Sequence, residues 1–223
     1  MNNAGKMLDS DLQRAVLEEL KWDARVKETD VGVEIHQGVV TLTGTVETWT
    51  ERLAAQEAAH RVKGVLDVAN DIRVIPPGSF ERTDTDLARA VRQALEWDVL
   101  VPHESIRTTI DQGVLTLEGK VTSWSQFDDA GRCVRNLAGI REVHNRLEVE
   151  PPEVAADKLR RAIEQALERH AEHTASKVAI GTSGGDVTLT GQVPSWSERL
   201  AIEGAVRGTP GVGKIANLLS VRL

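Results

Sequence analysis

The chain has 223 residues and a formal net charge of −7, with 40% hydrophobic and 27% charged residues. An acidic chain without a basic run lacks the electrostatic footprint of a nucleic-acid-binding protein, so we expect no nucleic acid partner. The sequence shows no apolar run long enough to span a bilayer and no signal-peptide core at its start, so we expect a cytoplasmic protein. A lone cysteine, Cys133, cannot form an internal disulfide, which agrees with a reducing compartment.

One pattern occurs three times along the chain, as GVVTLTGTVETW from Gly38, GVLTLEGKVTSW from Gly113 and GDVTLTGQVPSW from Gly185. The first two copies are 75 residues apart and the last two 72, and no gap is needed inside a copy. A period this long predicts a tandem array of small domains, with boundaries at 1–75, 76–150 and 151–223. A unit of this size is marginal alone, so we expect the units to pack on one another.

Each unit begins with a predicted amphipathic helix, followed by a predicted β-hairpin. In the first copy Leu12, Val16 and Leu20 recur at helical spacing. Alternation then predicts two strands joined by a tight turn at Gln37-Gly38. The recurring glycines, assigned here to turns and other structural positions, are Gly38, Gly44, Gly113, Gly119, Gly185 and Gly191.

A second helix is predicted directly after the hairpin. Thr48, Ser123 and Ser195 each stand three residues before Glu or Gln, the spacing of a capping box. We expect this helix to end near Gly64, Gly139 and Gly211, with each glycine as a left-handed C′ residue. A third strand follows, and proline pairs at 76–77 and 151–152 then stop it. The fold class is therefore α/β (α+β): three α-β-β-α-β units, each with two helices on a three-stranded mixed sheet.

The hairpin Gly-Val-x-Thr-Leu-x-Gly-x-Val, the Trp-bearing helix start and the Gly-Val-x-x-Val-x-Asn entry to the last strand together resemble the bacterial BON domain, three times over. The resemblance implies this fold, no catalytic activity, and roles in stress responses, envelope maintenance and attachment to phospholipid. Many relatives are expected to be periplasmic, whereas a BON unit in some cytoplasmic relatives is associated with potassium sensing.

Three aligned tryptophans, Trp49, Trp124 and Trp196, are candidates for binding a lipid surface or a partner groove. The alternative is that each ring closes one edge of its own core. Three aligned asparagines share the strand parity of apolar neighbours, so we expect backbone groups to satisfy their amides, with a polar ligand or cation as the alternative. These asparagines are Asn70, Asn145 and Asn217.

A basic cluster in the third unit, Lys158, Arg160 and Arg161, is the candidate contact for an anionic membrane. This unit has nine basic and eight acidic residues, for a charge of +1, whereas each of the others is at −4. His170 and His173 have the spacing of two ligands on one helix face, but no third ligand is near, so no metal and no cofactor are expected.

No catalytic constellation recurs, so the sequence predicts a non-enzymatic, stress-associated protein whose partner is a phospholipid headgroup or another protein. The alternatives are a cytoplasmic potassium sensor and an osmotic-stress scaffold or chaperone. Open sheet edges also allow a homodimer.

Overall fold

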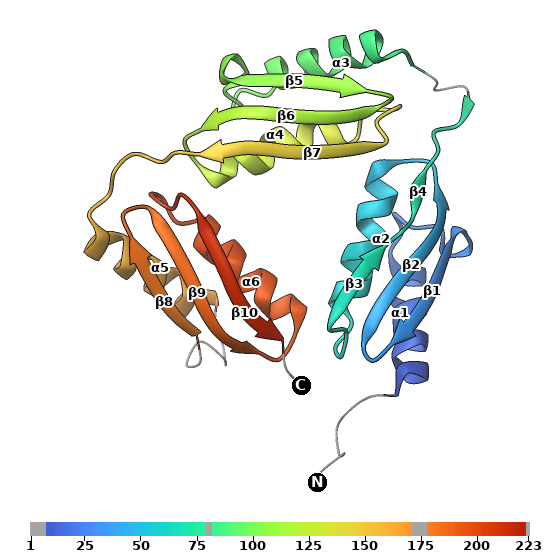
Figure 1. Cartoon of the computed structure of the whole chain (residues 1–223), viewed down its shortest axis with the longest axis horizontal. Coiled ribbons are helices and arrows are strands. Elements are labelled where there is room, and N and C mark those ends of the chain that lie inside the picture. The colour runs from blue at the N-terminus through green and yellow to red at the C-terminus, as the bar shows by residue number, and fades with distance from the viewer. Residues whose placement is uncertain (1–7, 79–81, 171–177, 222–223) are drawn as a thin grey trace.

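The computed structural model describes residues 8–78, 82–170 and 178–221, without the side chains of residues 169 and 170. The described chain forms three units in a ring, with the second unit between the first and the third (Figure 1).

The first unit contains α1 (Asp9–Trp22), η1 (Glu28–Asp30), β1 (Val31–His36), β2 (Val39–Val46), α2 (Trp49–Arg61), β3 (Asp67–Asn70) and β4 (Arg73–Val74). The second contains α3 (Asp84–Trp97), η3 (His103–Ser105), β5 (Ile106–Asp111), β6 (Val114–Val121), α4 (Trp124–Arg135) and β7 (Glu142–Val149). The third contains α5 (Ala156–His170), β8 (Val178–Ser183), β9 (Asp186–Val193), α6 (Trp196–Arg207) and β10 (Ile215–Val221).

Every unit has the predicted mixed sheet. The hairpin strands pair antiparallel, and the last strand pairs parallel to the central strand on its other side. In the first unit this last strand is split into β3 and β4, which both pair with β2. The last strands and the helices α2, α4 and α6 lie toward the centre of the ring (Figure 1). The second helix of each unit is therefore the one that meets the neighbouring units.

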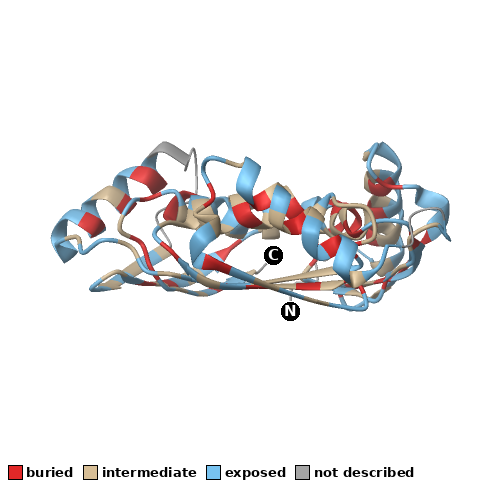
Figure 2. Cartoon of the chain, turned by 90° about the horizontal axis from the view of Figure 1, so that it is seen from above, coloured by how far each residue is buried: buried red, intermediate tan, exposed pale blue. Residues whose placement is uncertain are grey.

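Each unit buries its own hydrophobic core between its helices and one face of its sheet. The aligned leucines of the first helices, Leu12, Leu87 and Leu159, are at most 1% exposed. Seen from the side, helices lie over one face of the ring and strands along the other (Figure 2). Among the described residues, no helix is both long and apolar enough to cross a membrane.

The hairpin turn of the first unit is held by a carboxylate. Gln37 and Gly38 both have positive φ, at 53° and 82°. The side chain of Asp9 accepts hydrogen bonds from both backbone N–H groups, at 2.8 and 3.1 Å. Asp84 does the same for the second unit at Gln112 and Gly113.

The third unit departs from this arrangement, although Gly185 lies in the hairpin turn between β8 and β9. Gly184 takes a φ of 59°, and Gly185 is not among the positive-φ residues. Ala156 stands where the other units have their aspartate, and no carboxylate of the described residues bonds to the backbone of this turn. The Gly-Gly pair adopts a different turn because neither residue has a Cβ to restrict it.

The second helices begin where the capping boxes predict but end earlier than the glycines suggested. Thr48, Ser123 and Ser195 each accept a hydrogen bond from the backbone N–H three residues on. Gly64, Gly139 and Gly211 have positive φ of 105°, 98° and 92°, yet they lie three or four residues after the last helical residue. They are therefore turn residues that lead into the last strand rather than C′ caps.

Candidate functional site: the seams between the units

The tryptophans at the start of α2, α4 and α6 lie where neighbouring units meet. We call these meeting places the first seam (first and second units), the second seam (second and third units) and the third seam (third and first units). Each tryptophan begins one of the helices that lie toward the centre of the ring, and the indoles of Trp124 and Trp196 contact the neighbouring unit. The indoles of Trp49, Trp124 and Trp196 are accordingly buried or half-buried.

At the second seam, Trp124 is fixed by the third unit. Its indole Nε1–H donates to the backbone carbonyl of Gly213 at 2.8 Å. Its ring packs against the core of the third unit, and the Arg207 guanidinium lies 4.4 Å from the ring centroid. Arg207 also pairs with Asp128 of the second unit at 3.4 Å. Cation–π attraction and an ion pair therefore both act across this seam.

At the third seam, Trp196 makes the equivalent contacts with the first unit. Its indole Nε1–H donates to the backbone carbonyl of Leu66. Its ring stacks on the imidazole of His60, with centroids 4.7 Å apart and an interplanar angle of 22°. Burial lowers the pKa of His60, with a smaller lowering effect from Arg199 and a raising effect from Asp67. The lowered pKa favours the neutral form of the imidazole that stacks on the indole face.

The first seam is built from the same positions but is more open. Trp49 is 8% exposed and lines a cavity of about 370 Å³ together with Arg135 of the second unit. The Thr50 hydroxyl donates to Asn136 Oδ1 at 2.6 Å, beside the Arg135 carbonyl at 3.3 Å. Among the described residues, the Trp49 indole N–H makes no hydrogen bond to the second unit.

The three seams are related by the repeat. The offsets of 75 and 72 residues superimpose His60 on Arg135 and Arg207, and Leu66 on Arg141 and Gly213. Each second helix therefore receives the tryptophan of the preceding unit near its C-terminal end, and the third unit returns to the first. Head-to-tail contacts of this kind close into a ring when the rotations add up to a full turn.

Buried nitrogens mark the same three positions. His60 Nε2, Arg135 Nε and Arg207 Nε are buried without a hydrogen-bond partner among the described residues. An indole face lies against the imidazole of His60 and against the guanidinium of Arg207. An interaction with a π-system contributes less free energy than a full hydrogen bond. We therefore expect substitutions at these three positions to change the stability of the seams.

The seam tryptophans make contacts between units as well as within them. The rings do not simply close the edges of their own cores, because Trp124 and Trp196 bind backbone carbonyls of another unit. Their contacts are made with other units of the same chain, and binding to a separate partner stays a prediction. Trp49 is also mostly buried, so the three indoles present little surface to a bilayer.

The aligned asparagines are satisfied by their own units. Asn145 donates to the Phe127 carbonyl at 2.8 Å and accepts from the Leu147 backbone N–H at 3.3 Å. Asn70 and Asn217 accept from the N–H two residues on in the same way. The amides therefore tie the last strand to the second helix, as expected of buried polar groups.

The basic cluster of the third unit lies on α5 and is exposed. Arg160 pairs with Glu164 at 2.9 Å, whereas Lys158 and Arg161 form no ion pair among the described residues. Part of the positive charge at this surface is thus neutralised locally.

A second exposed surface was not predicted as a site. Trp22 and Trp97, at the ends of α1 and α3, are 82% and 76% exposed. Val99 and Leu100 directly follow Trp97 and are 94% and 59% exposed. We call Trp97, Val99 and Leu100 the apolar rim. The sequence carries no signal for the exposure of the two tryptophans, because helix periodicity does not show where a helix end meets solvent.

The remaining candidates carry little chemistry. Cys133 is half-buried, and burial raises the pKa of its thiol to about 11, which disfavours the reactive thiolate. The side chain of His170 and the whole of His173 lie outside the described residues. Within the described residues, no cluster of three or more His, Cys, Asp or Glu is arranged to hold a metal ion.

Comparison with known proteins agrees with the threefold repeat. The model of the BON domain family matches three times, at residues 8–76, 83–151 and 155–222. The chain belongs to the BON domain family. All three BON units contain the structural asparagine and the seam tryptophan described above.

Three curated BON relatives are similar over most of their length. Osmotically-inducible protein Y of Escherichia coli is 30% identical over 66% of this chain and 76% of its own. The 21 kDa hemolysin of Actinobacillus pleuropneumoniae is 27% identical over 63% and 74%. Outer membrane lipoprotein DolP of Haemophilus influenzae is 28% identical over 60% and 71%.

Proposed function

We propose that this BON protein is a non-enzymatic, stress-associated protein that attaches to a phospholipid surface. The observation that carries the proposal is the apolar rim, where a tryptophan, a valine and a leucine stand within four residues and are all largely exposed. An indole with an apolar body and one polar N–H suits the interface between headgroups and acyl chains. The names of the relatives, one osmotically inducible and one an outer membrane lipoprotein, support this class of function.

Charge decides how such attachment works. A chain at −7 is repelled by an anionic bilayer, and the second unit, which carries the rim, is itself at −4. Insertion of apolar side chains is therefore the expected driving force for the rim, with little dependence on salt. Attachment through Lys158, Arg160 and Arg161 would instead require anionic lipid and would weaken as salt screens the charges.

The test is flotation of the intact protein with neutral and anionic liposomes across a salt series. We expect Trp97→Ser combined with Leu100→Ser to abolish flotation. The matched control is Leu218→Ser, which removes another exposed leucine, 64% exposed, from a sheet face. Flotation lost instead in the Lys158, Arg160 and Arg161 triple alanine variant would assign attachment to the third unit.

No flotation under any condition would overturn the proposal. A protein partner, a potassium sensor or an osmotic-stress scaffold would then take its place. Thermal melting in sodium and potassium salts at equal ionic strength separates the sensor, because a bound ion raises the melting temperature selectively. The cytoplasmic location stays a prediction, and so does the homodimer.

A further inference from the structure

The three seams differ in the residue that receives the tryptophan of the preceding unit. His60 holds this position in the third seam, Arg207 in the second and Arg135 in the first. Arginine keeps its charge at any physiological pH, whereas histidine gains or loses a proton between about pH 5 and 8. The third seam is therefore the one of the three that can change its charge at this position.

Two carboxylates compensate the cation in the second seam. Arg207 pairs with Asp128 across the seam at 3.4 Å and with Glu203 of its own helix at 2.7 Å. In the third seam the repeat places Leu200 at the position of Asp128 and Gln56 at the position of Glu203. The third seam thus lacks both of the acids that accompany the cation in the second.

The surroundings of His60 are arranged for a neutral imidazole. Its Nε2 atom is buried without a hydrogen-bond partner among the described residues. Burial is the main cause of its lowered pKa, Asp67 of β3 opposes that effect, and Arg199 of α6 adds to it. Arg199 lies 4.5 Å from the centroid of the Trp196 ring, the same ring on which His60 stacks at 4.7 Å. A proton on His60 would place a second cation against this indole.

The first seam contains a cation at this position without either acid. Arg135 forms no ion pair among the described residues, and its Nε atom is buried without a hydrogen-bond partner there. Leu53 and Gly131 stand where the second seam has its two carboxylates. The charges of the first seam therefore match those that the third seam would have after protonation of its histidine.

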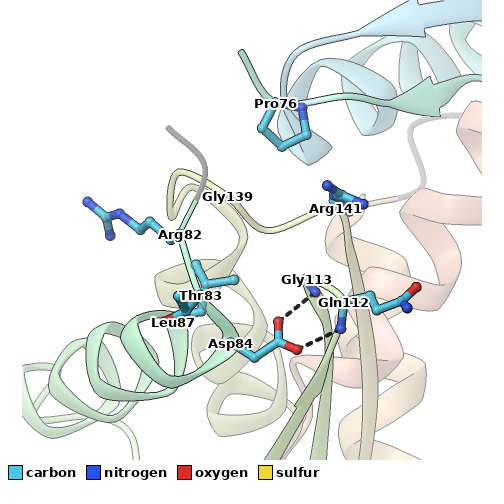
Figure 3. A pocket seen from close by; sticks show the side chains of 9 residues that line it. All are labelled: Pro76, Arg82, Thr83, Asp84, Leu87, Gln112, Gly113, Gly139 and Arg141. Carbon is cyan, nitrogen blue, oxygen red and sulfur yellow. Dashed lines mark hydrogen bonds between the residues drawn. The ribbon is translucent and has the colours of Figure 1, made fainter. Parts of the chain in front are cut away.

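The first seam is also the open one. Trp49 makes no hydrogen bond to a carbonyl of the second unit in the described structure and lines a cavity of about 370 Å³. Arg141, which aligns with the acceptors Leu66 and Gly213, instead lines a hollow of about 600 Å³ together with Pro76 (Figure 3). An uncompensated cation thus goes together with the loss of the indole hydrogen bond.

The third seam has no covalent support. The first and second units are consecutive in the chain, as are the second and third, and prolines at 76–77 and 151–152 lie between them. The first and third units are not consecutive, so non-covalent contacts alone close this seam. Because each unit has its own hydrophobic core, loss of these contacts would separate folded units rather than unfold them.

We propose that the third seam is an acid-sensitive latch of the ring. Protonation of His60 separates the first unit from the third, while both stay folded and remain attached to the second. Opening and proton binding are linked, because the imidazole in the open ring meets water and titrates near its ordinary pKa of about 6.5. Below that pH the ratio of open to closed chains rises about tenfold per pH unit, until the pH reaches the lowered pKa of the closed ring.

The test measures energy transfer between fluorophores on the first and third units of the intact chain, from pH 7.5 to 5.5. Labels are attached through Thr43→Cys and Gln192→Cys, at exposed positions of two sheets, and Cys133→Ala removes the native thiol. Alanine stands at the aligned positions 58 and 205 of the other units. We expect transfer efficiency to fall with pH while far-UV circular dichroism stays unchanged. Small-angle scattering of the unlabelled protein should show a matching rise in the radius of gyration.

Variants of the latch separate charge from other effects of pH. His60→Gln keeps the position neutral and should hold transfer high at every pH, whereas His60→Arg should hold it low. Leu200→Asp supplies the acid found in the second seam and should keep the ring closed at pH 5.5, which the uncharged Leu200→Asn should not do. His36→Gln removes an exposed histidine of the same unit and should leave the pH profile unchanged.

The other results decide against the latch. Transfer that does not depend on pH overturns it, and so does a fall that persists in His60→Gln. High transfer in His60→Arg contradicts it as well, because the seam would then accept an uncompensated cation. A parallel loss of circular dichroism would mean unfolding in place of opening. The latch does not rest on lipid attachment: His60→Gln should leave flotation at pH 7.5 unchanged, so each proposal stands or fails separately.

Discussion

The indole of Trp196 donates a hydrogen bond to the backbone carbonyl of Leu66, a residue 130 positions earlier in the chain. This contact joins the last unit to the first and closes the ring. Since His60 stacks on the same indole, one side chain makes two interactions across the third seam. Stability of the first and third units is therefore coupled, although a whole unit separates them in sequence.

Removing the indole N–H should weaken that coupling. We expect Trp196→Phe, which keeps an aromatic ring but loses the donor, to lower the free energy of unfolding by about 1 kcal/mol, the net value of one hydrogen bond. Urea unfolding measures the change. Trp22→Phe, at an 82% exposed position, is the control and should change nothing. Equal midpoints for the two variants would show that the third seam adds no stability.

The third seam should also make stability depend on pH. Burial lowers the pKa of His60 below 6.5 in the folded protein, so below pH 6.5 the unfolded chain binds a proton that the folded chain does not. The contribution of the neutral His60 to the free energy of unfolding is complete above pH 6.5 and is lost as pH falls toward the lowered pKa. Urea midpoints from pH 7.5 to 5.5 should therefore fall less steeply for His60→Arg, which places in this seam the residue found in the other two. An unchanged slope would exclude His60 as the source.

Gly44 should be intolerant of any side chain. Its φ is 128°, and a Cβ there would lie 2.1 Å from the Asp30 carbonyl oxygen. We expect Gly44→Ala to cost at least about 3 kcal/mol, since strain and overlap add. Gly78→Ala is the matched control, because its Cβ would meet nothing within 4 Å. Soluble yield and the urea midpoint report both variants, and a stable Gly44→Ala protein would contradict the geometry.

The strand asparagines should matter for stability and not for binding. Asn145→Ala removes two hydrogen bonds that tie β7 to α4 and to its own strand, so a loss of about 1 to 3 kcal/mol is expected. The thermal midpoint gives the loss, with exposed Gln192→Ala as reference. Flotation at a temperature where both variants are folded should match that of the unaltered protein. A selective binding defect would instead support the ligand role considered for this residue.

The sequence alone determined the number of units, their element order and the mixed sheet. Local signals are strong here: apolar residues at helical spacing in Leu12, Val16 and Leu20, capping boxes at Thr48 and Ser123, and a turn at Gln37-Gly38. Three aligned copies also separate recurrent features from incidental ones. The lengths of the second helices were less certain, because Gly64 marks a turn that local signals do not distinguish from a helix cap.

Only the tertiary structure decided what the tryptophans do. Trp124 and Trp196 follow the same local pattern whether they face lipid, their own core or a neighbour, since a capping box fixes where a helix begins and not what its first residue meets. Their acceptors lie 89 and 130 residues away in sequence. The openness of the first seam is likewise a result of the packing between two units. Trp49 lines a cavity there, whereas Trp124 and Trp196 reach a carbonyl of the next unit.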